Sequence, residues 1–252
     1  MSRARLYMIP GTVWHLTHRC HDRSFLLRFA CDRQCWQKWI YRAKIRYGLR
    51  VLSYAITSNH VHLIVYVDKN AEAVARSIML AASQTALRYN RRKERTGAFW
   101  EDNYHATAVD TDSHLVACLV YIDLNMVRAG VVRHPEDWPW CGWQEIAGSR
   151  ERYCLIDKPL LMDFLKIGRP QDLGSRYKEW IAQAVGSSEL TRQPIWTESV
   201  AVGREAFVDR IRDELGLKVL YRGKAEESGT FVLREPRLGY SSFSARKIGS
   251  KA

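Results

Sequence analysis

The feature that most constrains the fold is a pair of apolar, β-rich runs in the first third of the chain. Residues 49–57 and 60–67 are rich in Val, Leu, Ile and Tyr, and a short polar segment, Thr57-Ser58-Asn59, joins them. Two such runs separated by a short polar join are typical of a β-hairpin. A fold of this chain therefore has to contain an antiparallel strand pair.

Helical and extended periodicities alternate around this hairpin. In chain order, the expected elements are a strand at 11–19, a helix at 31–48, the hairpin, a helix at 71–94, a strand at 98–109 and a helix at 113–130. Gly48, Gly97 and Gly130 stand at or just past the ends of the three helices, as helix-stop signals do. The order β-α-β-β-α-β-α predicts an α+β fold, with a mainly antiparallel, ferredoxin-like sheet and helices packed on it.

The second part of the chain carries weaker patterns. A segment dense in Pro and Trp at 134–143 predicts the end of the first domain, so we expect one domain at 1–150 and a smaller, mainly helical extension at 151–252. The helices expected there lie around 158–167, 175–185 and 204–215, followed by a basic stretch after about residue 238. The extension could serve DNA recognition or packing.

The charge of the chain points to a polyanionic partner. Its 39 Lys and Arg against 27 Asp and Glu give a net charge of +12. Residues 1–150 hold 21 − 13 = +8 of it and residues 151–252 hold 18 − 14 = +4. Nucleic acid is the first candidate partner and an anionic membrane surface the second.

The absence of targeting patterns and the spacing of the cysteines indicate the cellular compartment and the redox state of the thiols. With no apolar run of 18 or more residues and no signal-peptide h-region, we expect a cytoplasmic, nucleoid-associated protein without a membrane partner. The six cysteines form no C-x-x-C pair, which argues against a zinc ribbon or a disulfide scaffold and favours reduced thiols.

Two histidines in the hairpin are candidate metal ligands. His60 and His62 are two apart on an expected strand, so both side chains project from one face of the sheet and can converge on one ion. A structural pair of strand histidines is the alternative. Imidazole ligands alone would suit zinc equally well.

A polar stripe marks the helix expected at 113–130. At about 100° per residue, Tyr121, Asn125 and Arg128 share one side of that helix, at i, i+4 and i+7. Because residues four apart have neighbouring side chains, the Asn125 carbonyl oxygen could join the two histidines beside the Tyr121 hydroxyl. The alternative is a tyrosine that only packs its ring. Asp123 interrupts the apolar side of the helix without an evident reason.

These motifs together resemble the single-tyrosine (Y1) transposases of the HUH endonuclease superfamily, most closely the REP-associated branch. The likeness rests on residues 54–67, on 97–132, which contains Y-I-x-L-N-x-V-R-A-G, and on 136–143. It covers about residues 8 to 145. We therefore expect a nuclease and strand transferase that acts on DNA.

The resemblance also implies roles for particular residues. It places the metal ligands at His60, His62 and Asn125 and the nucleophile at Tyr121. It further implies Mg²⁺ or Mn²⁺, a 5′-phosphotyrosine intermediate, a free 3′ hydroxyl and single-stranded, hairpin-forming DNA as substrate. Thr57-Ser58 and Met126 depart from the family's Met-Pro and Asn-Pro patterns, and without a proline at 126 we expect a straighter helix around Asn125.

Basic side chains are the candidate DNA contacts. They are Arg19, Arg23, Arg88, Arg91, Arg92, Lys93, Arg95 and Arg128. Charge runs are often only solvated surface, but the overall charge favours phosphate neutralisation for the 88–95 cluster. Other aromatic and histidine side chains have competing roles: we expect core packing rather than base stacking for most of Trp100, Trp138, Trp140 and Trp143, and structural or phosphate contacts rather than metal ligation for His15, His18, His21 and His105.

Two other functions remain open at this point. The chain could be a non-catalytic DNA-binding protein derived from a transposase, or a hydrolase that uses metal-bound water. The sequence also leaves open whether Tyr121 serves its own histidines or those of a second subunit, and so whether a monomer or a homodimer acts.

Overall fold

The computed structural model describes residues 8–101, 103–186 and 190–235, so the basic stretch after residue 238 lies outside the described residues. The strands are β1 (Thr12–Arg19), β2 (Arg50–Ile56), β3 (His60–Val67), β4 (His105–Val109), β5 (Ala201–Gly203), β6 (Gly223–Glu227) and β7 (Thr230–Arg234). The helices are α1 (Ala30–Tyr47), α2 (Ala71–Arg92), α3 (Ser113–Asp123), α4 (Asn125–Arg128), α5 (Trp143–Ile146), α6 (Lys158–Leu165), α7 (Pro170–Gly186), α8 (Ile195–Glu198) and α9 (Glu205–Leu215).

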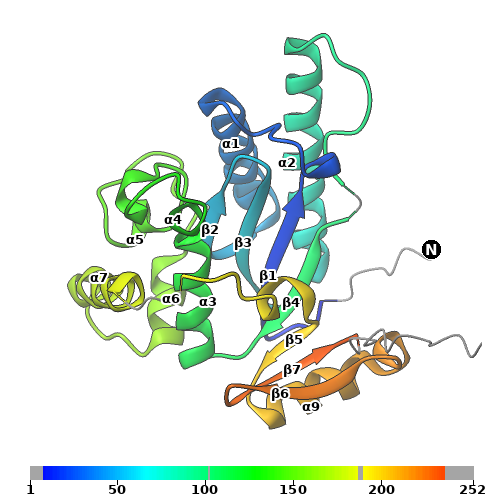
Figure 1. The fold of residues 1–252 in the computed structure, drawn as a ribbon, viewed down its shortest axis with the longest axis vertical. Helices are drawn as coiled ribbons and strands as arrows, with labels where there is room; N and C mark the ends of the chain where they lie inside the picture. Colours follow the sequence, from blue (N-terminus) through cyan, green and yellow to red (C-terminus); the bar gives the residue numbers. More distant parts are fainter. Residues whose placement is uncertain (1–7, 102, 187–189, 236–252) are drawn as a thin grey trace, which may run out of the picture.

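The first four strands form the predicted antiparallel sheet. β1 lies between β3 and β4, and β2 flanks β3 as the other strand of the expected hairpin (Figure 1). The register pairs Thr17 with His62 and Arg19 with His60. The α+β fold and the order β-α-β-β-α-β-α are thus confirmed for this part of the chain.

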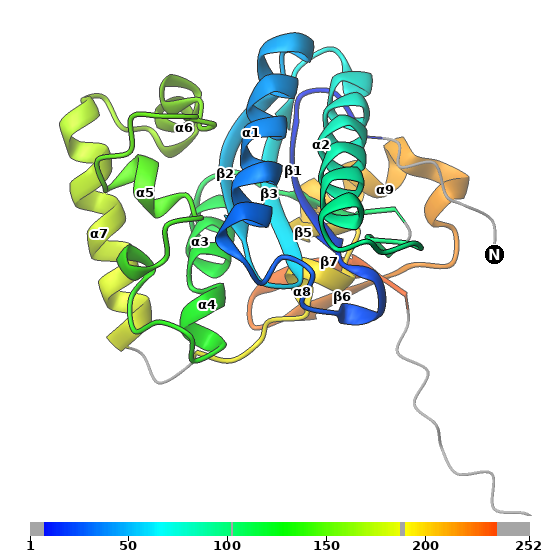
Figure 2. The same cartoon turned by 90° about the horizontal axis from the view of Figure 1, so that it is seen from above.

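Helices cover both faces of this sheet. α1 and α2 pack against each other on one face, while α3 and α4 lie on the other (Figures 1 and 2). Alternation along β3 turns Val61, Leu63 and Val65 towards one face, and His60 and His62 towards the face that holds α3 and α4. The hairpin therefore aims its two histidines at the predicted tyrosine helix.

The C-terminal extension contains the predicted helices α6, α7 and α9, but also three strands that the sequence patterns did not indicate. β5 pairs with β4 in parallel, and β7 and β6 follow, which makes a seven-stranded mixed sheet (Figure 1). β5 has only three residues and β6 reads GKAEE, so neither shows the apolar alternation that reveals a strand. Their place in the sheet depends on tertiary pairing.

The prediction of a single helix at 113–130 is wrong, because the helix breaks at Leu124. That residue has φ −77° and ψ 1°, which ends α3 before α4 begins. Asp123 is turned inward, and its carboxylate accepts from the Gly142 amide at 3.1 Å and the Tyr177 hydroxyl at 2.8 Å. The Arg128 guanidinium donates at 2.7 Å to the Tyr121 carbonyl, the acceptor that an unbroken helix would give to its own backbone. The straighter helix expected from Met126 is therefore also wrong.

The expected packing of the tryptophan side chains is largely confirmed. Trp138 and Trp143 are buried, and Trp100 stacks on His18 at 4.3 Å between ring centroids. The half-buried Trp140 lies under the Arg33 guanidinium at 4.0 Å. All six cysteines are free. Among the described residues, no helix is long and apolar enough to cross a membrane.

Candidate active site

A cavity of about 230 Å³ opens where the start of β3 faces the break between α3 and α4. The structure brings His60, His62, Tyr121 and Asn125 together in its lining. The full lining is Thr17, Arg19, His60, His62, Tyr121, Asn125, Arg128, Ala129, Arg192 and Thr197. All four groups proposed for chemistry therefore line the same cavity of one chain.

His62 is held on both of its ring nitrogens. Its Nε2 lies 3.0 Å from the Asn125 carboxamide, and its Nδ1 lies 2.8 Å from His15 Nε2 and 3.2 Å from the Thr17 hydroxyl. The side chain is buried, and its ring stacks on that of His15 with centroids 5.0 Å apart. Strand β1 thus fixes the imidazole from behind, while α4 approaches it from the cavity side.

His60 is oriented by the turn that precedes it. Its Nδ1 lies 2.7 Å from Asn59 Oδ1 and 3.0 Å from the Thr57 hydroxyl. Asn59 Nδ2 donates to the Arg23 carbonyl at 3.1 Å, which turns Asn59 Oδ1 towards the imidazole. Because that oxygen can only accept, His60 Nδ1 carries the proton and Nε2 keeps its lone pair.

Thr57, which stands where the resembled family has a methionine, has a structural role in this turn. The Thr57 hydroxyl donates to the His60 carbonyl at 2.8 Å and accepts from the His60 amide at 3.1 Å. A methionine at this position would offer neither hydrogen bond. The local change in sequence therefore supports the conformation that presents His60.

Both histidines are neutral at physiological pH. Burial lowers the pKa of His60 to about 4, and the charges of Arg19 and Arg128 act in the same direction. Burial also lowers the pKa of His62 well below its usual range, with smaller contributions from His60 and His15. Protons therefore do not compete with a cation for the imidazole lone pairs at pH 7.

Tyr121 lies on α3 at the inner wall of the cavity and is only 6% exposed. Its ring centroid is 6.1 Å from that of His62 and 6.2 Å from that of Trp196, and the Arg128 guanidinium lies over the ring at 4.1 Å. Burial raises the pKa of the Tyr121 hydroxyl, whereas the Arg128 charge lowers it. The cation thus favours the phenolate that an attacking tyrosine has to form.

The donor set fits a divalent ion only if Asn125 takes part. Within residues 8–101, 103–186 and 190–235, no three His, Cys, Asp or Glu side chains are grouped to hold a metal. His60 and His62 supply two neutral imidazoles, and Asn125 places its carboxamide beside them, with Nδ2 3.0 Å from His62 Nε2 and with Oδ1 as the oxygen that would ligate the ion. Two nitrogens and one oxygen leave positions for substrate oxygens, as a catalytic metal requires.

The predicted DNA-contacting residues fall into two groups. Arg19 and Arg128 line the cavity. The others lie outside its lining. They are Arg23, Arg88, Arg91, Arg92, Lys93 and Arg95. Arg92 donates both of its hydrogen bonds, at 2.6 Å, to the buried Asp32 carboxylate, which gives it a structural partner at the end of α2.

Sequence reasoning missed three polar residues of the cavity. Thr17 lies two residues from both His15 and Arg19 on one face of β1, directly across from His62, so strand alternation could have found it. Arg192 and Thr197 come from the irregular segment around α8 in the C-terminal extension. No local pattern marks them, because only the fold brings that segment to the site.

The other histidines have structural contacts, as expected. His15 contacts the Trp196 carbonyl and His62, and His105 Nε2 lies 2.9 Å from the Ser199 carbonyl. His18 stacks on Trp100, and His21 lies 3.3 Å from the exposed Asp22 carboxylate.

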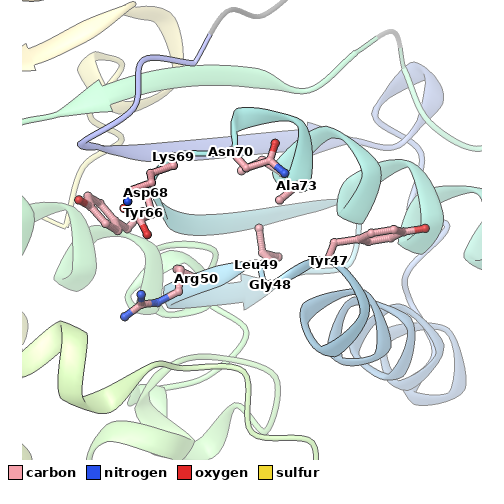
Figure 3. A pocket seen from close by; sticks show the side chains of 10 residues that line it. Tyr47, Gly48, Leu49, Arg50, Tyr66, Asp68, Lys69, Asn70 and Ala73 are labelled. Atoms are coloured by element: carbon pink, nitrogen blue, oxygen red, sulfur yellow. The ribbon is translucent and has the colours of Figure 1, made fainter.

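One further cavity adjoins the site, and another lies away from it. One, of about 180 Å³, shares Thr17, Arg19 and Thr197 with it and continues towards Glu101 and His105. Another, of about 160 Å³, lies near the other end of β3 beside Tyr66 and Asp68, and none of the predicted site residues lines it (Figure 3). The polar groove therefore extends from the candidate site along β1 and β4.

Comparison with known proteins identifies related sequences and folds. Residues 10–125 match the family described as IS200-like transposases. A REP-associated tyrosine transposase bound to a REP hairpin is similar in structure, at 19% identity over 58% of this chain and 85% of that chain, with a TM-score of 0.47. A candidate transposase from Deinococcus radiodurans R1 is similar at 14% identity over 46% and 91%, with a TM-score of 0.33. No curated protein matches the sequence.

Proposed function

Since residues 10–125 belong to the IS200-like transposase family, we propose that this transposase-like chain cuts and rejoins single-stranded DNA, with Tyr121 as the nucleophile. The observation that carries the proposal is the convergence of His60, His62, Tyr121 and Asn125 on one cavity. The net charge of +12 supports a polyanionic substrate.

In the proposed reaction, the Tyr121 oxygen attacks the scissile phosphorus. Tyr121 loses its hydroxyl proton to solvent as the tyrosyl O–P bond forms, the P–O3′ bond breaks, and the released 3′ oxygen takes up one proton from solvent to become a hydroxyl, so that no net proton is gained or lost. Arg128 stabilises the phenolate from the ring face, at 4.1 Å. The 5′-phosphotyrosine link retains the energy of the broken phosphodiester, so a different 3′ hydroxyl can reverse the reaction and join a new strand.

Positioning of the phosphate falls to the polar groups around the tyrosine. His60, His62 and Asn125 would hold Mg²⁺ or Mn²⁺, which when bound polarises the phosphate oxygens and offsets their charge. Arg19 lines both the candidate site and the cavity that adjoins it. A DNA strand that passes from one cavity to the other would place a phosphate beside Arg19. We propose hairpin-forming DNA as the substrate, the cytoplasmic nucleoid as the location, and a monomer as sufficient for cleavage.

A covalent-adduct assay tests the nucleophile. Purified protein, MnCl₂ and a labelled single-stranded oligonucleotide with a hairpin should give an SDS-stable protein–DNA adduct. Tyr121→Phe should abolish the adduct, because phenylalanine lacks the attacking oxygen. Tyr221→Phe is the matched control, since Tyr221 is 85% exposed and lies outside the cavity.

The two alternative functions give different results in the same assay. Nicked DNA without an adduct would indicate a hydrolase that activates water, and salt-sensitive binding without nicking would indicate a non-catalytic DNA-binding protein. An adduct that forms equally well with Tyr121→Phe would overturn the proposed nucleophile.

A further inference from the structure

A chain of hydrogen bonds runs from the C-terminal extension to the candidate site. The Trp196 carbonyl lies 2.9 Å from His15 Nδ1, His15 Nε2 lies 2.8 Å from His62 Nδ1, and His62 Nε2 lies 3.0 Å from the Asn125 carboxamide. The Thr107 hydroxyl lies 2.7 Å from the Ser199 carbonyl and 3.2 Å from the Trp196 carbonyl, so this segment also contacts β4.

The direction of each bond follows from the chemistry of its ends. A backbone carbonyl can only accept, so His15 Nδ1 carries a proton. The 2.8 Å contact between His15 and His62 has room for one proton, on one nitrogen or the other. If it belonged to His15, that ring would be a fully buried cation whose two hydrogen-bond partners are a backbone carbonyl and the His62 imidazole.

The buried position of His15 argues against that cation, because a charge that lies between a backbone carbonyl and a second imidazole, away from water, is costly. With the proton on His62 Nδ1 instead, both rings are neutral and both hydrogen bonds of His15 are kept. The shared proton therefore belongs to His62 Nδ1. His62 Nε2 is then an acceptor, and the lone pair that it directs at Asn125 is the one that a cation in the cavity would use.

We propose that His15, anchored by the Trp196 carbonyl, is a positioning residue that fixes His62 in the Nδ1-protonated tautomer required for metal ligation. The C-terminal extension thereby prepares a ligand that is located in the family-matched part of the chain. Without His15, the partner left to His62 Nδ1 is the Thr17 hydroxyl at 3.2 Å, which can donate or accept and so selects neither tautomer.

This inference rests on the proposed function for its purpose, but its first test does not require activity. In metal-free protein labelled with ¹⁵N-histidine, the nitrogen shifts of His62 should show a single Nδ1-protonated tautomer at pH 7. His15→Phe should convert this to a mixture of tautomers. His60 is the internal reference, because Asn59 fixes its tautomer independently of His15.

A conservative variant separates the hydrogen bonds from simple packing. In His15→Gln, one carboxamide can donate to the Trp196 carbonyl and accept from His62, so the single tautomer should return. Mn²⁺ affinity, measured by electron paramagnetic resonance, should fall about 10- to 100-fold in His15→Phe and recover by at least half of that loss in His15→Gln.

The outcomes distinguish the two proposals. A single Nδ1-protonated tautomer and unchanged Mn²⁺ affinity in His15→Phe would overturn the role of His15, even if wild-type protein forms the tyrosyl adduct. Equal loss in both variants would mean that His15 only packs, which also overturns it. If the tautomer and Mn²⁺ affinity respond as expected but wild-type protein forms no adduct, the positioning role stands and the proposed function fails.

Discussion

The two parts of the chain contribute to the cavity in different ways. Residues up to about 150 place His60, His62 and Tyr121 on a regular strand and a regular helix. Residues beyond 150 contribute through the segment around α8, which supplies Arg192 and Thr197. Three of the four groups proposed for chemistry thus stand on a longer strand or helix, while the residues added to the cavity lining come from a connecting segment.

The attachment of the extension explains how an irregular segment can serve a site. β5 adds to the edge of β4, and α7 packs on α3 with its Tyr177 hydroxyl bonded to Asp123. The segment around α8 lies between these two attachments in the sequence and is held at both ends. We therefore expect large losses of activity from substitutions in residues 1–150 and smaller losses of DNA binding from substitutions beyond residue 150.

We expect the largest effect on activity from the loss of His60 or His62. His60→Ala and His62→Ala should each lower the single-turnover cleavage rate at least about 10³-fold, because each removes a ligand for the group that offsets phosphate charge. Quenched-flow measurements with saturating hairpin DNA would give the rates. His114→Ala should retain the wild-type rate, since His114 lies on α3 but outside the cavity.

A rate reduction of less than tenfold for both variants would contradict the proposal that the first part of the chain supplies the metal-binding groups for chemistry. It would mean that the histidines shape the cavity without binding a catalytic ion, and that Tyr121 and the arginines carry the reaction.

The next effect concerns the junction between the parts. Tyr177→Phe should cost about 1 kcal/mol of unfolding free energy at pH 5 and about 2 to 3 kcal/mol at pH 8. Burial raises the pKa of Asp123 from 3.8 to about 7, so the stability that this group contributes at low pH is lost as pH rises towards 7. The Tyr177 hydroxyl lowers that pKa, so its removal raises the pKa further and extends the loss above pH 7.

Urea unfolding at the two pH values measures this difference. Tyr221→Phe should change neither value by more than about 0.5 kcal/mol, because that side chain is 85% exposed. A cost for Tyr177→Phe that is equal at pH 5 and pH 8 would show that Asp123 keeps the same charge at both.

Local periodicity explains what could be predicted from the sequence. Alternation along residues 60–67 placed His60 and His62 on one face, and the helical stripe brought Tyr121 and Asn125 together even though the helix breaks between them. The break leaves the stripe intact because one residue, Leu124, separates α3 from α4, so Tyr121 and Asn125 still line the same cavity.

What could not be predicted depends on contacts distant in sequence. Asp123 had no evident role because its partners are Gly142 and Tyr177, 19 and 54 residues away. β5 is too short to show a pattern, and Arg192 reaches the cavity only through the path of the segment around α8. A single sequence carries no periodic signal for such contacts.

We expect a moderate effect on DNA binding from the loss of Arg192, which the C-terminal extension contributes to the cavity lining. Arg192→Ala should weaken DNA binding about 10-fold and reduce the salt slope by about one phosphate contact, because Arg192 is a cation of the cavity lining. The cleavage rate at saturating DNA should change less than the affinity. Fluorescence anisotropy across a range of salt concentrations measures this, with Arg212→Ala, on α9 outside the cavity, as the control. A lower rate with unchanged affinity would place Arg192 in the chemical step.

The smallest expected effect tests the exposed basic end of α2. Arg91 and Lys93 are exposed and lie outside the cavity lining. Changing both to Ala should leave the cleavage rate at saturating DNA within about twofold and weaken binding less than Arg192→Ala does, because exposed cations contribute about 0 to 1 kcal/mol each. Anisotropy under the same salt series measures it. A loss greater than that of Arg192→Ala would mean that a surface outside the cavity contributes most of the DNA binding, and that substrate binding also depends on the first part of the chain.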